Sequence, residues 1–382
     1  MVDSDAVRVL IAPDSFGGTL SAVEAADAIA AGWRAGAPDV ELDLAPVSDG
    51  GPGFVDVLLT SLGGELGTVT VTGPLGEPVE AAFLLDRETG YVESAQACGL
   101  HLVPPDRRDP TLTTTYGVGQ LLRAALAAGA RRLVVGLGGS GTNDGGAGML
   151  TALGVRLEDA AGTGLPPGAA ALVDLARADA SGLDARLADV DLVAATDVDN
   201  PLLGRFGATA MYGAQKGASP ADLQLLEAAL AHYADALGRA LPGARSVTDA
   251  AGAGAAGGLG YAVLVLGGRR ESGIGLVLEQ ARLIERIAAA RLVVTGEGSY
   301  DRQSLRGKAT SGVAAAAQVA GLPCLVLAGR VEVGRREMAA AGVAAAYSLV
   351  DETGSVQVAQ AHAGEELARL AERVARQWSG TG

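Results

Sequence analysis

Residues 136–146, GLGGSGTNDGG, combine six glycines with hydroxyl, amide and carboxylate side chains. Glycine lets the backbone approach another group closely, and the N–H groups of such loops bind phosphate. The segment follows the apolar run RRLVVG, which is typical of a buried strand. We therefore expect a phosphate or nucleotide cradle whose residues are Gly138, Gly139, Ser140, Gly141, Thr142 and Asn143.

Two other interpretations of this loop stay open. Residues 136–141 also match the dinucleotide fingerprint G-x-G-x-x-G, with Glu158 in the place of its ribose-binding acid. Residues 252–257 match the same pattern with no clear strand before them, so the pattern carries little weight in a chain with 56 glycines. The third interpretation is a purely structural turn.

Four further loops carry charged residues next to glycine or proline. Their sequences are SDGG (48–51), TDVDNP (196–201), YGAQKG (212–217) and GEGSYDRQSLRGK (296–308). The charged residues of interest are Asp49, Asp197, Asp199, Lys216, Glu297, Asp301, Arg306 and Lys308. Each loop taken alone could be a turn or a solvated surface. Together they supply the cations, metal-binding carboxylates and proton acceptor that phosphoryl transfer needs.

Other chemistries find little support in the sequence. There is no G-x-x-x-x-G-K-[ST] phosphate loop and no H-R-D or D-F-G kinase motif. The three histidines suggest neither a hydrolase triad nor a zinc site. A net charge of −15 argues against nucleic acid as a partner.

The compartment is also indicated by composition. Cys98 and Cys324 lie far apart, outside metal or redox spacings, which fits a reducing cytoplasm. The first residues, MVDSDAVRVLIAPDSF, have acids where a signal peptide has basic residues. No apolar run reaches the roughly 18–20 residues of a membrane span. We expect a cytoplasmic protein without a membrane partner.

The fold class follows from the order of the elements. Short apolar strands alternate with helices, which predicts an α/β protein with mostly parallel sheets. A capping box at Ser21 and Glu24 predicts a helix over residues 22–36, and Ser219 with Pro220 predicts the start of another. Residues 67–94 instead predict an antiparallel meander. The Gly/Asp loops follow strands, so they should lie at the carboxyl edge where ligands bind.

These loops together resemble the type I glycerate kinase family. The resemblance runs from residue 11 to residue 309 and extends into the strand PCLVLAG. The matching stretches are IAPDSFGGTLSA, PVSDGGPGF, GLGGSGTNDGGAGML, TDVDNPLLG, GAQKGAS, GAGAAGGLG and VTGEGSYDRQSLRGKA.

The resemblance implies a kinase that phosphorylates D-glycerate with ATP and Mg²⁺, with 2-phosphoglycerate the favoured product. It also implies a flavodoxin-like (Rossmann-like) domain and a smaller, discontinuous α/β domain, with the active site in the cleft between them. We expect the first domain to comprise residues 1–65, 125–197 and 285–382, and the second residues 66–124 and 198–284. The oligomeric state is open, with a homodimer as one possibility.

The chain departs from the family pattern at three positions. Gly17 stands where the family has lysine, Pro52 replaces the acid of DGGEG, and Gly141 replaces an alanine. These changes leave a related small hydroxy acid open as the acceptor. A nicotinamide-dependent oxidoreductase and a non-catalytic nucleotide sensor are the alternatives from other classes.

We assign roles to the candidate residues on this basis. Asp197 and Asp301 are the expected Mg²⁺ ligands, and Asp49 or Asp197 the proton acceptor. Asp14, Ser15 and Arg306 are expected to bind the substrate, and Glu297 to contribute to the nucleotide site. The cations expected to compensate phosphate or carboxylate charge are Lys216, Arg306 and Lys308.

Overall fold

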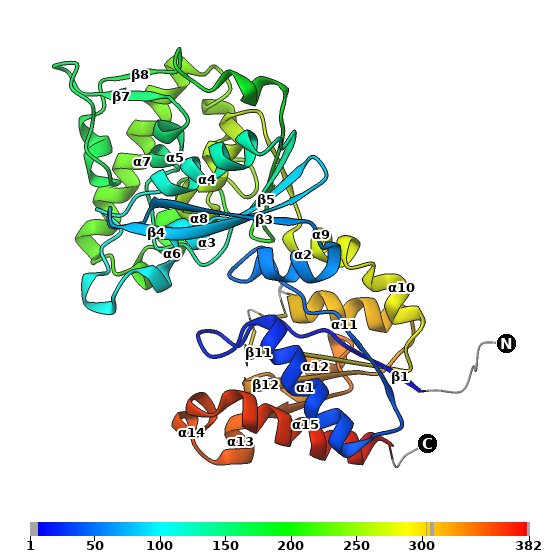
Figure 1. The fold of residues 1–382 in the computed structure, drawn as a ribbon. Helices are drawn as coiled ribbons and strands as arrows, with labels where there is room; N and C mark the ends of the chain where they lie inside the picture. Colours follow the sequence, from blue (N-terminus) through cyan, green and yellow to red (C-terminus); the bar gives the residue numbers. More distant parts are fainter. Residues whose placement is uncertain (1–6, 303, 306–308, 380–382) are drawn as a thin grey trace. The chain divides into compact units, whose positions relative to one another are not determined.

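The computed structural model describes residues 7–302, 304–305 and 309–379 (Figure 1). The chain divides into two compact units. Unit 1 comprises Met1–Asp49, Asp56–Leu62 and Ile274–Gly382, and unit 2 comprises Gly50–Val55 and Gly63–Gly273. The predicted α/β class with two domains is confirmed.

The centre of unit 1 is a five-stranded sheet in which every pairing is parallel. Its spatial order is β2-β1-β11-β12-β13, which in chain order is 2-1-3-4-5, the flavodoxin arrangement. Ligands of such sheets bind outside the carboxyl ends of the strands. The strands are β1 (Arg8–Ile11), β2 (Glu41–Leu44), β11 (Leu292–Tyr300), β12 (Cys324–Val331) and β13 (Ala345–Ser348).

Helices surround this sheet, and two of them pack closely. The predicted capping box at Ser21 and Glu24 is confirmed at the start of α1 (Ala22–Gly36). A Cβ on Gly32 would lie 1.9 Å from the carbonyl oxygen of Ala368 in α15 (Ala363–Ser379), so only glycine permits this contact (Figure 1). The other helices of the unit are α10 (Leu283–Ala288), α11 (Ala309–Val319), α12 (Arg335–Ala340), α13 (Leu349–Thr353) and α14 (Val356–Ala361).

Unit 2 is built on a mixed sheet of six strands in the order β10-β9-β6-β5-β4-β3. Its first three strands in the chain form the predicted antiparallel meander, and the other pairings are parallel. The strands are β3 (Glu65–Thr72), β4 (Pro78–Asp86), β5 (Thr89–Glu93), β6 (Arg132–Gly136), β9 (Asp191–Ala195) and β10 (Arg269–Glu271). A separate antiparallel pair joins β7 (Arg156–Glu158) to β8 (Arg177–Asp179).

The helices of unit 2 include one long element, α7 (Pro220–Ala240), which begins at the predicted Ser219 cap. Its shorter helices are α3 (Ala95–Cys98), α4 (Tyr116–Ala127), α5 (Ala147–Ala152), α6 (Ala208–Tyr212) and α8 (Ala255–Val265), with the 3-10 turn η5 (Ala214–Lys216). Two helices, α2 (Phe54–Leu62) and α9 (Gly273–Gln280), include residues of both units.

The observed division differs from the expected domain boundaries in one large segment. Residues 125–197 were expected with the flavodoxin-like domain, but they belong to unit 2. The reason is strand pairing: β6 lies between β5 and β9 in one continuous ladder, with Gly136 opposite both Glu93 and Ala195. The meander is therefore one edge of this sheet and not a separate insertion.

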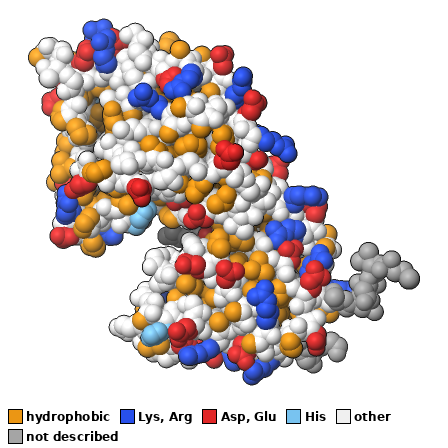
Figure 2. Space-filling view, in the orientation of Figure 1, with side chains coloured by type: hydrophobic (Ala, Val, Ile, Leu, Met, Phe, Trp, Pro, Cys, Tyr) orange, Lys and Arg blue, Asp and Glu red, His pale blue; other side chains and the backbone are white. Residues whose placement is uncertain are grey.

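Surface charge is mixed on the face drawn in Figure 2. Basic and acidic side chains are interspersed among the described residues of that face, without a broad basic area. In the described part of the chain, every helix is too short or too polar to cross a membrane.

Candidate functional site

The carboxyl edge of the unit 2 sheet gathers several of the predicted residues. Three neighbouring strands end at the same level, because Glu93, Gly136 and Ala195 lie opposite one another. The glycine loop, residues 136–146, leaves this edge from β6, and Asp197 follows β9.

Packing within the protein itself requires glycine at two positions of this loop. A Cβ on Gly138 would lie 2.6 Å from the Cα of Gly51, and one on Gly139 would lie 2.7 Å from Cγ of Pro52. No side chain fits at either distance. The close approach predicted from the glycines is thus real, but the group approached is the segment beginning at Gly50.

Part of the predicted cradle faces inward. Thr142 and Asn143 are completely buried, and Nδ2 of Asn143 donates a hydrogen bond to Oγ1 of Thr209 at 2.9 Å. The N–H group of Gly141 donates to the carbonyl oxygen of Cys98 at 2.8 Å. These contacts hold the loop in shape, and the role of these residues in binding phosphate stays a prediction.

Asp144 is the buried centre of the loop, although it is not among the candidate site residues predicted from the sequence. Its carboxylate accepts hydrogen bonds from the N–H and Oγ1 of Thr115 and from the N–H groups of Gly146 and Gly148, at 2.8–3.2 Å. Burial raises the pKa of Asp144, and these hydrogen bonds oppose the rise. The amino-terminal N–H groups of α5 are thereby occupied by the protein itself.

Lys216 lies inside unit 2 and contacts the glycine loop. Only 3% of the residue is exposed, and Nζ donates to Oγ of Ser140 at 3.0 Å and to the carbonyl oxygen of Thr142 at 2.7 Å. Burial lowers the pKa of Lys216 to about 8, and the charge of Asp144 opposes that fall. Lys216 therefore holds the loop, and the structure gives it no exposed ammonium group with which to meet a phosphate.

The lowered pKa of Lys216 predicts a pH dependence. Turnover should fall as pH rises through about 8, because the neutral amine binds Thr142 and Ser140 less strongly. The effect on folding has the opposite sign: between pH 8 and the ordinary pKa of 10.5, the unfolded chain binds more protons at Lys216, so its contribution to the free energy of unfolding rises with pH. A pH profile of kcat beside urea titrations at the same pH values tests both signs. Loss of turnover and of stability together would contradict this assignment.

Asp197 is half-buried at the carboxyl end of β9. Oγ of Ser272, the residue after β10, donates to Oδ1 of Asp197 at 2.6 Å. The parallel pairing of β9 and β10 brings these residues together, as the sheet-edge argument predicted for Asp197. Ser272 had no assigned role.

Unit 1 carries a second group of predicted residues at the carboxyl edge of its own sheet. The N–H of Asp14 donates to the carbonyl oxygen of Gly296 at 2.8 Å, and the N–H of Ser15 donates to Oδ1 of Asp14 at 2.6 Å. Asp14, Ser15 and Asp49 are all half-buried. Asp49 follows β2, the strand beside β1.

Glu297 and Asp301 are linked in unit 1 by a serine that the sequence did not single out. Oγ of Ser304 donates to Oε2 of Glu297 at 2.8 Å, and the N–H of Ser304 donates to Oδ1 of Asp301 at 3.2 Å. Ser304 is completely buried and Glu297 nearly so, whereas Asp301 is half-buried. The aspartate is therefore the more accessible of the two carboxylates.

Two predicted cations, Arg306 and Lys308, lie outside the described residues. Gly17, which stands where the resemblance implies lysine, is exposed, and a Cβ there would meet nothing within 4 Å. Packing therefore does not require glycine at this position.

The dinucleotide interpretation of residues 136–141 fails on strand placement. The fingerprint needs its acid on the parallel strand next to the one that enters the loop. Glu158 instead lies on β7, which belongs with β8 to a separate two-stranded sheet, and it contacts Arg156 and Arg177 at 3.9 and 3.7 Å. Glu158 is part of a surface ion-pair cluster.

The described residues do not form a ready-made metal site from protein side chains alone. Among them, no three His, Cys, Asp or Glu side chains gather closely enough to hold an ion. Asp197 belongs to unit 2 and Asp301 to unit 1. Mg²⁺ in kinases commonly takes one or two carboxylates and completes its shell with phosphate and water, so such a trio is not needed.

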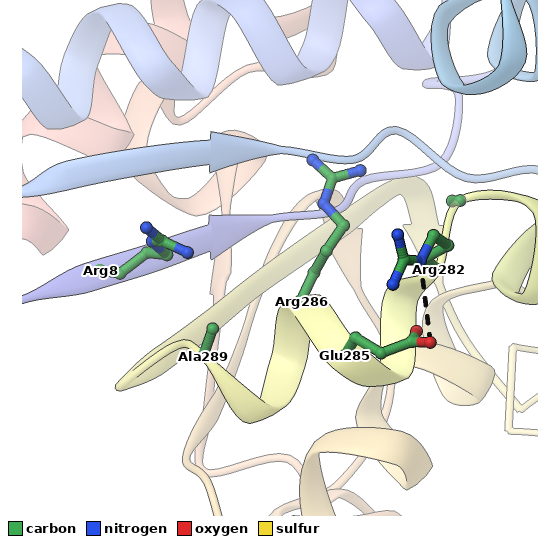
Figure 3. A pocket seen from close by; sticks show the side chains of 6 residues that line it. Arg8, Arg282, Glu285, Arg286 and Ala289 are labelled. Carbon is green, nitrogen blue, oxygen red and sulfur yellow. Dashed lines mark ion pairs between the residues drawn. The ribbon is translucent and has the colours of Figure 1, made fainter.

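Unit 1 also has a cavity of about 310 Å³ (Figure 3). Its lining includes Arg8, at the start of β1, whereas Asp14 follows the end of that strand. Arg8 pairs with Glu41, Arg286 with Asp43, and Arg282 with Glu285. Because its arginines are already neutralised, the cavity is a poor anion site.

Comparisons with known proteins agree on one family. The model of the Glycerate kinase family matches residues 9–379. The glycerate kinase of Bacillus subtilis (strain 168) is 45% identical over 97% of each chain, and the glycerate 2-kinase of Escherichia coli (strain K12) is 41% identical over 97% of each. A crystal structure from Salmonella typhimurium LT2, provisionally named glycerate kinase 2, superposes with a TM-score of 0.80 at 40% identity, covering 98% of this chain and 99% of that one.

Proposed function

The chain belongs to the glycerate kinase family of phosphotransferases, and from this we propose that it transfers the terminal phosphoryl group of ATP to D-glycerate with the help of Mg²⁺. The favoured product is 2-phosphoglycerate. The observation that carries the proposal is a similarity to named glycerate kinases that runs over nearly the whole chain. The carboxylate-rich sheet edges of both units support it.

In the proposed reaction, one bond to the γ-phosphorus forms and another breaks. The glycerate hydroxyl oxygen bonds to the γ-phosphorus, the bond from that phosphorus to the bridging oxygen breaks, and ADP leaves. A carboxylate takes the hydroxyl proton, and Asp49 and Asp197 are the candidates, both half-buried.

The phosphates of ATP meet the backbone at Gly138 and Gly139 in this proposal. Gly139 is exposed and Gly138 is half-buried, in contrast to the inward-facing residues after them. Lys216 acts behind this surface by fixing Ser140 and Thr142, so it is a positioning residue. Arg306 and Lys308 are proposed as the cations that approach the transferring group.

The donor set suits a hard cation. Asp197 and Asp301 offer half-buried carboxylate oxygens, the type of ligand that Mg²⁺ prefers. When bound, Mg²⁺ neutralises phosphate charge and orients the terminal phosphoryl group. Glu297 and Ser304 orient Asp301, while Asp14 and Ser15 provide polar groups for glycerate.

The proposal predicts ADP release that depends on the acceptor. We expect release from ATP and Mg²⁺ with D-glycerate at on the order of 1–100 s⁻¹, against controls without acceptor and with L-glycerate. Phosphorus NMR of the product distinguishes the 2- from the 3-phosphate. ADP release with a related hydroxy acid but not with glycerate would mean that the hydroxy acid, and not glycerate, is the acceptor. ATP protection against heat without any release would favour a nucleotide sensor.

A further inference from the structure

Residues Gly50–Val55 belong to unit 2, although the chain on both sides of them, Met1–Asp49 and Asp56–Leu62, belongs to unit 1. We call Gly50–Val55 the strap. The strap begins directly after Asp49, one of the two candidate proton acceptors. The backbone of Asp49 is thus joined by one peptide bond to a segment that unit 2 holds.

Packing holds the first residues of the strap tightly. A Cβ on Gly136 would lie 2.7 Å from the carbonyl oxygen of Gly50. Gly50 itself has a φ of +95°, and a Cβ there would lie 2.7 Å from the carbonyl oxygen of Ala195. Backbone meets backbone on both sides, so this part of the strap has little freedom to shift.

A buried carboxylate holds the other end. Glu93, the last residue of β5, is 4% exposed. Its Oε2 accepts hydrogen bonds from the N–H groups of Gly53 at 3.0 Å and Val55 at 3.4 Å. Hydrogen bonds to an ionised acceptor are roughly twice as strong as neutral ones. They also occupy N–H groups at the start of α2, which otherwise lack partners within the helix.

We propose that Glu93 is a positioning residue, which anchors the strap to the unit 2 sheet and thereby fixes Asp49 for phosphoryl transfer. This inference rests on the proposed function for the part that concerns Asp49. The anchoring itself does not depend on any activity. Glu93 touches no reacting atom, so its effect on turnover passes through Asp49.

The first test measures anchoring by amide hydrogen exchange. In Glu93→Gln, which keeps the side-chain shape but loses the charge, we expect the peptide covering residues 50–55 to exchange about tenfold faster. Glu88→Gln, on the exposed turn before β5 where Glu88 pairs with Arg131, is the matched control and should exchange like the wild type. Unchanged protection in both Glu93→Gln and Glu93→Asp would overturn the anchor.

The second test is a double-mutant cycle on kcat. We expect Glu93→Gln to lower kcat about tenfold, with the KM for ATP within about twofold, because a small misplacement of a reacting group is costly. In an Asp49→Asn background, the same change should lower kcat by less than about twofold. Full additivity, or an Asp49→Asn enzyme as active as the wild type, would overturn the positioning role.

Failure of the proposed function gives a different result. A wild-type protein that releases no ADP with any hydroxy acid, yet loses strap protection in Glu93→Gln, refutes the kinase proposal and the role of Asp49 with it, while the anchor stands. A kinase whose strap protection is unchanged in both Glu93 variants refutes the anchor alone.

Discussion

Replacing Lys216 with methionine is expected to lower kcat about a hundredfold while unit 2 stays folded, because a misplaced site can cost that much in rate. Methionine fills most of the space of the lysine stem but donates no hydrogen bond. Oγ of Ser140 and the carbonyl oxygen of Thr142 would both lose the donor that now fixes them. The loop that carries Gly138 and Gly139 would then lose its inner support.

The rest of the composition supports a specific need for lysine at this position. The chain has 29 basic residues, and only Lys216 and Lys308 among them are lysine. Arginine serves everywhere else, yet its planar, bulkier head cannot replace a compact ammonium group in a buried site. Both lysines lie in loops that sequence reasoning assigned to the site.

Steady-state kinetics beside thermal melting checks the Lys216 prediction. Arg239→Met removes an exposed cation from the last turn of α7 and serves as the control, with an expected kcat within about twofold of wild type, as for most surface substitutions. The residual activity of Lys216→Met should also lack the fall near pH 8. A Lys216→Met enzyme within about twofold of wild type would remove Lys216 from the catalytic apparatus.

Local patterns predicted the elements of the fold well. The caps at Ser21 and Ser219 and the meander that became β3, β4 and β5 depend on residues close together in the chain. The assignment of residues 125–197 to one unit or the other depends on which strands pair with β6 and β9. Short apolar strands look alike in sequence, so their pairing partners could not be read from it.

For the candidate site, the sequence likewise did not reveal which side chains face the interior and which distant residues they contact. Thr142 and Asn143 were expected to bind a ligand because they are polar and follow glycines, but they face the interior. A loop has no period that separates an inner from an outer face. Glu93 was missed for a related reason: its partners, Gly53 and Val55, are about 40 residues away in the chain. A carboxylate at the end of an otherwise apolar strand was the available signal.

Asp144→Ala is expected to destabilise unit 2 by about 4 kcal/mol, since buried donors left without an acceptor cost about 1–3 kcal/mol each. The N–H groups of Thr115, Gly146 and Gly148 would lose the completely buried acceptor that they share. For a unit of this size, such a loss lowers Tm by roughly 10 °C. Lys216 would also lose a favourable charge, so its pKa should fall further below about 8.

Asp159→Ala is the control that separates the effect of burial from the effect of losing backbone hydrogen bonds. Oδ1 of Asp159 also accepts two backbone hydrogen bonds, from Ala161 at 2.8 Å and Thr163 at 2.9 Å, but in a surface turn. Water can replace that acceptor, so we expect a loss of about 1 kcal/mol or less. Calorimetry of the two variants measures the difference. Equal losses would mean that the Asp144 network contributes no more than an ordinary turn, and that the glycine loop depends mainly on its packing against the strap.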